Sequence, residues 1–210
     1  MSDNIYLDNA AATRIDDRVL QAMEPYFLET YAVATSEFAY SMGIEAREAL
    51  DDARHTLARS LKAVDDEVIF TSGGVESSNL ALKGAAKASQ RNHIIISGIE
   101  DFPVLHSAKT LEQEGFQVTR LAVDGDGHVD LEQLRDAIRD DTLLVSVQYA
   151  NQEIGTTQDI QAIGDICQDT DVLFHTDATH AYTRMPLDVT ATSVDLVTLS
   201  GHTIHGPKGI

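Results

Sequence analysis

Short runs of β-branched and other apolar residues recur along this chain, and a cluster of polar residues or glycines follows most of them. Runs of this length and composition are typical of strands that are buried on both faces. Stretches with the apolar spacing of helices separate most of the runs. The alternation predicts an α/β fold with a mainly parallel sheet that helices cover on both faces. The predicted strands are residues 68–71, 93–97, 117–123, 143–147, 172–174 and 194–199.

Aspartates mark where several of the predicted helices begin, because a carboxylate at the N-cap accepts hydrogen bonds from the first free amides. Asp16 or Asp17 can cap a helix that runs to about residue 31. Asp130, with Gln133 three residues later, can cap another. Further helices are predicted over residues 43–62, over residues 103–114 and from residue 159.

Polar side chains follow the last two predicted strands at the point where each strand ends. The first of them leads into Phe174-His175-Thr176-Asp177, and the second leads into Ser200-Gly201-His202. In an open α/β sheet, ligands bind at the carboxyl ends of the strands. The two clusters therefore predict a ligand site at this edge of the sheet.

A glycine turn after residues 68–71 adds a second signal. Ser72-Gly73-Gly74-Val75-Glu76 separates this predicted strand from an Ala- and Leu-rich helix. Free amides and the positive end of the dipole at the start of a helix bind phosphate well. A tight turn in which Glu76 favours the helix dipole explains the same residues without a ligand, so both interpretations stay open here.

Composition limits the classes of partner. The chain has 210 residues, 43% of them hydrophobic and 23% charged, which favours one packed domain over a disordered chain. Its 34 acidic and 15 basic residues give a net charge of −19, which argues against binding to nucleic acid or to an anionic membrane. Cys167 is the only cysteine and lies on the apolar face of a predicted helix, so we expect a buried thiol. No signal peptide or long apolar segment is visible, and we expect a cytoplasmic protein.

The clusters together resemble the pyridoxal-phosphate site of the cysteine desulfurases, a branch of the class V aminotransferases. The resemblance covers the Thr71–Asn79 turn, the turn at Asn151 and the sequence Ser200-Gly201-His202. It implies the large domain of fold type I pyridoxal-phosphate enzymes, a three-layer sandwich around a mainly parallel sheet. It also implies pyridoxal 5'-phosphate as cofactor. The cofactor-binding residues that it implies are Gly73, Gly74, Asn151, Asp177, His180, Ser200 and His202.

The chain departs from that family at residues that carry its chemistry. Thr203 stands where the family has the lysine that forms an imine with the cofactor, and a hydroxyl cannot form one. Asp101 stands where a histidine stacks on the ring, and Val75 replaces a threonine that bonds the phosphate. The family's last strand, its carboxyl-terminal domain and its persulfide cysteine have no counterpart in residues 1–210. We therefore expect no catalytic residue, and a cofactor that is weakly and noncovalently bound or absent.

The sequence leaves several functions open. The favoured one is a catalytically degenerate desulfurase-like protein with a binding or regulatory role in sulfur transfer or iron-sulfur assembly. The alternatives are an enzyme that uses pyridoxal or pyridoxamine phosphate without a lysine, with His202 as its base, and half of a split desulfurase. A gene remnant is a third alternative. We expect a homodimer, or a complex with a desulfurase, a sulfur acceptor or a separately encoded carboxyl-terminal half.

Two further expectations concern domains and metals. Residues 1–210 are predicted to form a single truncated class V large domain, in which residues 1–40 border the substrate mouth. His175, Asp177 and His180 also form a pattern of metal ligands, but nothing in the sequence supplies groups to orient them, so we expect no metal.

Overall fold

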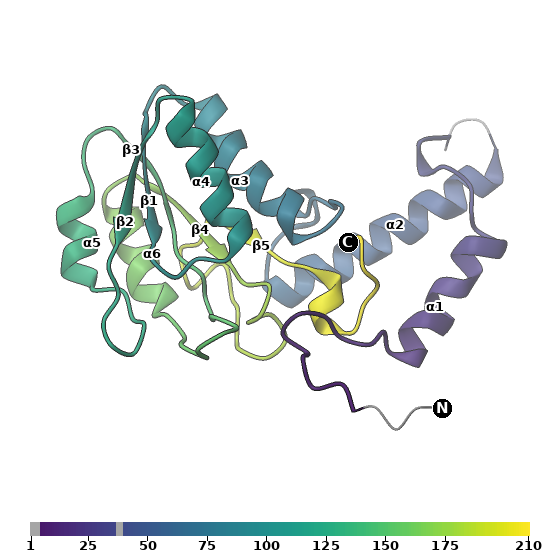
Figure 1. The fold of residues 1–210 in the computed structure, drawn as a ribbon. Helices are drawn as coiled ribbons and strands as arrows, with labels where there is room; N and C mark the ends of the chain where they lie inside the picture. The colour runs from purple at the N-terminus through teal and green to yellow at the C-terminus, as the bar shows by residue number, and fades with distance from the viewer. Residues whose placement is uncertain (1–4, 37–39) are drawn as a thin grey trace.

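A computed structural model describes residues 5–36 and 40–210 of the chain. At its centre is a parallel sheet with the strand order β2-β1-β3-β4-β5 (Figure 1). The strands are β1 (His93–Ser97), β2 (Gln117–Leu121), β3 (Thr142–Ser146), β4 (Leu173–Asp177) and β5 (Leu196–Thr198). The predicted α/β class with a mainly parallel sheet is confirmed.

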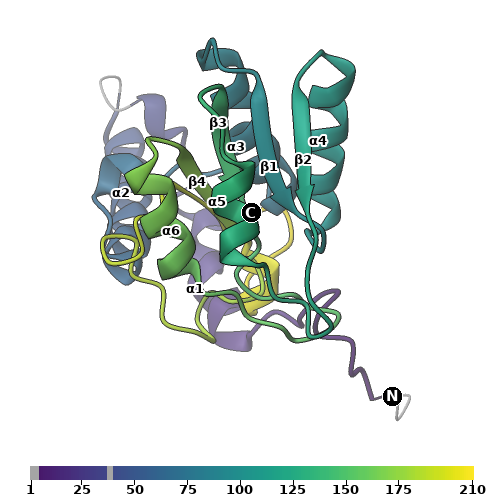
Figure 2. The same ribbon diagram turned by 90° about the vertical axis from the view of Figure 1, so that its left-hand side faces the viewer.

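Helices cover both faces of the sheet (Figure 2). On one face are α3 (Gly74–Ala88) and α4 (Phe102–Gln113), and on the other are α5 (Leu131–Ala137) and α6 (Ile160–Asp169). The side chains of a strand alternate between these layers. In β1, for example, Ile94 and Ile96 join the core beneath α3 and α4, whereas Ile95 joins the core on the α5 and α6 side. All three are fully buried, as the prediction for this strand requires.

Two helices extend from the body of the fold. They are α1 (Asp17–Leu28) and α2 (Ser41–Leu61), and Figure 1 shows α1 and the start of α2 lying away from the sheet. The predicted cap of α1 is confirmed, because the Asp16 carboxylate accepts a hydrogen bond from the amide of Arg18 at 2.8 Å. The helix ends at Leu28, before the predicted residue 31. Only the far end of α2 reaches the core, where Leu61 is buried.

The prediction of a strand at residues 68–71 is wrong. These residues join no sheet: they follow the short 3-10 helix η2 (Asp65–Glu67) and lead into the turn before α3. A strand needs a neighbour to share its backbone hydrogen bonds. Residues 68–71 and β5 instead line opposite sides of a cavity, so no described strand pairs with them.

Several local predictions are confirmed. Asp130 caps α5 by accepting from the amides of Glu132 and Gln133, and Asp159 caps α6. Cys167 on α6 is fully buried, as its apolar face predicts. Among the described residues, no helix combines the length and the apolar composition that crossing a bilayer requires.

Candidate cofactor-binding site

A cavity of about 1030 Å³ lies at the carboxyl ends of β4 and β5, the edge at which the sequence predicts a ligand. Its walls come from the start of α3, the start of α4, the loop after β3 and the residues that follow β4 and β5. The structure brings together all but one of the predicted site residues. The predicted residues that line the cavity are Gly73, Gly74, Asp177, His180, Ser200 and His202.

The start of α3 offers hydrogen-bond donors to this cavity. The first helical bond runs from the amide of Ser77 to the carbonyl of Gly73 at 3.1 Å, so the amides of residues 74–76 precede it and are free of helical partners. Gly73 has a φ of 130° and a ψ of 177°, a conformation that only glycine adopts readily. Glu76 also accepts from the amide of Ser72 at 2.6 Å. The turn thus has its own stabilising bond and still leaves amides for an anion.

His202 contributes a polar atom whose bonding is incomplete. It lies in the 3-10 helix η3 (Gly201–Ile204) and lines the cavity. Its Nδ1 is buried, and among the described residues it has no hydrogen-bond partner. A buried polar atom without a partner costs about 1–3 kcal/mol.

Asp177 ends β4 at the floor of the cavity and is 2% exposed. Its Oδ1 accepts hydrogen bonds from the amide of Thr179 at 2.9 Å and from the Thr179 hydroxyl. Burial raises the pKa of Asp177 to about 6 although the bonds from Thr179 favour the charged form, and the nearby charge of Asp101 raises it further. A protonated ring nitrogen in the cavity would stabilise this carboxylate and lower its pKa.

Behind this floor lies a second buried carboxyl group, which the sequence did not single out. Glu100 is 5% exposed and accepts at Oε1 from the Ser97 hydroxyl at 2.6 Å and from the amide of Gln148 at 2.7 Å. Its Oε2 is buried without a partner among the described residues. Burial is the main cause that raises the pKa of Glu100 to about 8, and the charges of Asp177 and Asp101 add to it. The group is therefore mostly protonated at neutral pH.

Asn151, the remaining predicted site residue, is not among the residues that line the cavity. Its Nδ2 donates to the carbonyl of Ile99 at 2.8 Å, and its Oδ1 accepts from the amides of Glu153 and Ile154. These bonds hold the loop after β3 against the loop after β1. The next residues along the chain, Gln152 and Glu153, line the cavity instead. A contact between Asn151 and a cofactor stays a prediction.

His175, one of the residues in the alternative metal pattern, lies in the core. Its ring nitrogens lie 2.8 Å from the Ser146 hydroxyl and 2.9 Å from the Thr198 hydroxyl. Burial lowers the pKa of His175 to about 3, so the ring is neutral. Within the part of the chain that the structure describes, no group of three or more His, Cys, Asp or Glu side chains could hold a metal ion.

Comparison with known proteins identifies the family that shares this arrangement. The sequence model described as "Aminotransferase class-V" matches residues 5–210. The chain belongs to the class V aminotransferases. It is 47% identical to the cysteine desulfurase IscS of Neisseria meningitidis serogroup A over 208 residues, which are 98% of this chain and 51% of that protein.

Solved structures of cysteine-desulfurase type have the same fold. A structure named "SspA in complex with cysteine" has a TM-score of 0.94 and 36% sequence identity. The match covers 98% of this chain and 59% of the chain in that structure. The structure of a NifS-like protein has a TM-score of 0.94 and 38% sequence identity. The match covers 98% of this chain and 57% of that protein's chain. The chain thus has a cysteine-desulfurase-like, fold type I architecture and spans about half the length of the relatives that it matches. Class V aminotransferases of this type use pyridoxal phosphate.

Thr203, which the sequence resemblance matches to the family's lysine, is fully buried and is not among the residues that line the cavity. Its hydroxyl lies 2.7 Å from the carbonyl oxygen of Thr179 and 2.8 Å from that of Ser200. The side chain is therefore held by the backbone around it. Lys208, the nearest lysine along the chain, is exposed and does not line the cavity either.

The charges around the cavity differ from those that a phosphate requires. None of its lining residues in the described part of the chain is Lys or Arg, whereas five are carboxylates: Asp8, Glu76, Asp101, Glu153 and Asp177. The free amides of α3 fit the phosphate of the cofactor, and Asp177 fits its ring nitrogen. None of the described residues that line the cavity carries an amine that would fit its aldehyde. The residues therefore fit noncovalent binding of pyridoxal phosphate, weakened by the acidic surroundings.

Proposed function

We propose that this chain is a cysteine-desulfurase-like protein that does not desulfurate cysteine by itself. It acts through binding to a desulfurase, a sulfur acceptor or a separately encoded carboxyl-terminal half, in sulfur transfer or iron-sulfur assembly. The observation that carries this proposal is Thr203, whose hydroxyl is bonded to Thr179 and Ser200 at the position where the reaction needs a primary amine.

Pyridoxal phosphate, when bound, supplies an electron sink for bonds at the carbon that carries the substrate's amine. In this chain the amides at the start of α3, Ser200 and His202 would hold its phosphate, and Asp177 would orient its ring. Val75 removes one hydrogen bond to the phosphate, and Asp101 removes a ring contact. These two losses weaken binding by about 2–4.5 kcal/mol, or roughly 30- to 2000-fold, before the missing covalent link is counted.

The direct test is treatment of the purified chain with pyridoxal phosphate and borohydride, followed by dialysis and peptide mass mapping. The wild-type chain should retain no coenzyme at a defined side chain. In Thr203→Lys an amine becomes available next to the cavity, and coenzyme should be found at position 203. Thr203→Ser, which keeps the hydroxyl, should behave as wild type. Stoichiometric labelling of any one side chain in the wild-type protein would refute the proposal.

The binding role has a separate test. The chain is mixed with the Neisseria IscS desulfurase, and size-exclusion elution and cysteine-dependent sulfide release are measured with and without it. We expect co-elution and a changed rate of sulfide release. The absence of both co-elution and a change in rate, with this desulfurase and with its unmatched half expressed alone, would count against a binding role.

A second candidate is a reaction with pyridoxamine phosphate that needs no lysine, with His202 as the proton-transferring base. The position of His202 in the cavity wall favours it. Wild-type protein loaded with pyridoxamine phosphate should then keep an absorbance band through dialysis, and His202→Gln should lose it. A colourless wild-type protein would exclude this candidate.

A further inference from the structure

Negative charge in the candidate cofactor cavity has no positive side chain to balance it. None of the five carboxylates that line the cavity forms an ion pair with a Lys or Arg in the described ranges. Asp177 is buried, and although its Oδ1 is hydrogen-bonded, its Oδ2 accepts from no described residue. A carboxylate oxygen that is withdrawn from water without a donor is costly. The cavity therefore stabilises an occupant that brings positive charge into it.

Asp101 places one of these carboxylates at the start of α4. Its Oδ1 accepts from the amide of Phe102 at 2.8 Å, as the N-cap of that helix, and its Oδ2 accepts from no described residue. The cap holds the side chain at the cavity wall and leaves one oxygen for a ligand. The sequence resemblance matches this position to a ring-stacking histidine, so the carboxylate is a departure from the family.

The charge of Asp101 acts on other titratable groups of the cavity. Burial is the main cause that raises the pKa of Asp177, and the charge of Asp101 raises it further. Burial lowers the pKa of His180, and the charges of Asp101 and Glu153 oppose that change. Electrostatic interactions of this kind weaken with distance and with exposure to water. Asp101, Glu153 and Asp177 therefore act together on whatever occupies the cavity.

The cavity also favours an anion at the start of α3, where the amides of residues 74–76 have no helical partner. A ligand that suits both features carries a phosphate and a protonated amine. The two forms of the vitamin B6 coenzyme differ in this respect. Pyridoxamine phosphate carries an ammonium group at neutral pH, whereas pyridoxal phosphate carries an uncharged aldehyde at the same carbon. Charge is thus the property by which this cavity can distinguish them.

We propose that the cavity prefers pyridoxamine phosphate to pyridoxal phosphate, and that Asp101 determines this preference by attracting the ammonium group. The inference rests on the proposed function, in which no lysine at position 203 holds the aldehyde form covalently. Without that bond, the choice between the two forms depends on noncovalent contacts alone. Asp101 is the specificity-determining residue, and Glu153 and Asp177 add to the negative potential around it.

The test compares two ligands that differ at one group. Isothermal titration calorimetry of the full chain, at neutral pH and low salt, measures the affinity for pyridoxamine phosphate and for deoxypyridoxine phosphate. In the second ligand a methyl group replaces the aminomethyl group, and no aldehyde is present to react with surface lysines. Wild type should bind pyridoxamine phosphate about 10-fold more tightly, because an ion pair at a half-buried wall is stronger than an exposed one. Added salt should reduce the difference.

Variants of Asp101 separate its charge from its structural role. Asp101→Asn removes the charge and preserves the helix cap, because asparagine and aspartate are equally good at the N-cap. It should reduce the preference for pyridoxamine phosphate at least ~3-fold, while deoxypyridoxine phosphate binds as well as before or better. Asp101→Glu, which keeps the charge, should keep the preference. Asp140→Asn makes the same change in net charge at an exposed position outside the cavity, and it should bind both ligands as wild type does.

Three results would overturn the inference. The first is equal binding of the two ligands by wild type. The second is a loss of affinity in Asp101→Asn that is equal for both ligands, because Asp101 would then only stabilise the fold. The third is no measurable binding of either ligand. None of these results bears on the proposed lack of desulfurase activity, because its borohydride and co-elution tests involve neither Asp101 nor pyridoxamine phosphate.

Discussion

Glu100→Gln is the change that tests the buried carboxyl group behind the cavity most directly. The glutamine retains a carbonyl oxygen that can accept from the Ser97 hydroxyl and from the amide of Gln148, but it cannot ionise. It is also close to glutamate in size. The variant therefore removes the titration of this group and preserves the contacts at Oε1.

The magnitude follows from the two pKa values of Glu100, about 8 in the folded chain and 4.5 as the ordinary value. Between them the folded protein holds a proton that the unfolded chain releases, so the free energy of unfolding falls as pH rises. The stabilising contribution is fully present below pH 4.5 and is lost as pH rises through 8. The difference of about 3.5 between the pKa values corresponds to about 5 kcal/mol over that range and to about 3 kcal/mol at pH 7.

Asp177 and His175 also titrate, and a comparison of wild type with Glu100→Gln separates their effect on stability from that of Glu100. Asp177, with a pKa raised to about 6, acts in the same direction as Glu100. His175, with a pKa lowered to about 3, acts oppositely and destabilises the fold as pH falls below 6.5. Both groups are present in wild type and in Glu100→Gln. To a first approximation the difference between the two unfolding curves therefore isolates Glu100.

The assay is urea unfolding at several pH values from 5 to 8.5, followed by far-ultraviolet circular dichroism because the chain has no tryptophan. Relative to wild type, Glu100→Gln should gain stability steadily as pH rises. Glu24→Gln, at an exposed position of α1, should keep the wild-type pH dependence. The reasoning is refuted if wild type and Glu100→Gln lose stability with pH at the same rate.

Three further changes test other parts of the fold and site. Val75→Thr adds a hydroxyl at the start of α3 and should tighten pyridoxal phosphate about 10- to 150-fold in an absorbance titration, whereas Val75→Ala should not. Gly164→Ala places a Cβ against the carbonyl oxygen of Thr192, and it should lower the melting temperature by several degrees. Gly84→Ala, with nothing closer than 3.8 Å to its Cβ, should not lower it. Cys167 is buried with its pKa raised to about 12, so thiol reagents should modify it only after unfolding. Rapid labelling of the native protein would contradict its buried position.

Local signals in the sequence predicted most of the fold. Apolar runs located the five strands of the sheet to within a few residues, and aspartates located the starts of α1, α5 and α6. Such signals act over one turn or one strand, where the chain itself supplies the partner. Residues 68–71 have the same composition as a strand, but strand formation there depends on a neighbour far along the chain. The sequence pattern cannot show whether that neighbour is present.

The residues of the candidate site likewise divide into those that local sequence signals predicted and those whose surroundings depend on distant parts of the chain. The polar residues after β4 and β5 were predicted because each cluster follows a strand end directly, and the glycine turn at Gly73 was predicted because it comes directly before a helix. Glu100 was not predicted as buried, because its burial depends on Ser97 nearby and on the amide of Gln148, which is distant in sequence. Asn151 was predicted from its motif alone, and its hydrogen bonds to the loop after β1 become visible only in three dimensions.

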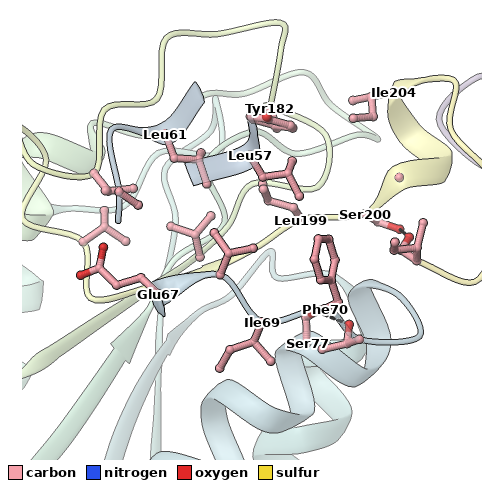
Figure 3. A pocket seen from close by; sticks show the side chains of 18 of the residues that line it. Leu57, Leu61, Glu67, Ile69, Phe70, Ser77, Tyr182, Leu199, Ser200 and Ile204 are labelled. Carbon is pink, nitrogen blue, oxygen red and sulfur yellow. Dashed lines mark hydrogen bonds between the residues drawn. The ribbon is translucent and has the colours of Figure 1, made fainter. Parts of the chain in front are cut away.

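Ser200 lines both the candidate cofactor site and an apolar cavity of about 300 Å³ that residues 68–71 also line (Figure 3). Its hydroxyl donates to the carbonyl of Ile210, and the amide of Gly201 donates to the same oxygen at 2.8 Å. Any molecule that fills the apolar cavity would therefore lie close to a residue that also lines the candidate cofactor site. If such a molecule changes the affinity for pyridoxal phosphate by some factor, pyridoxal phosphate must change the affinity for that molecule by the same factor. Binding measurements at each of these two cavities, made with and without an occupant of the other, therefore test whether Ser200 couples them.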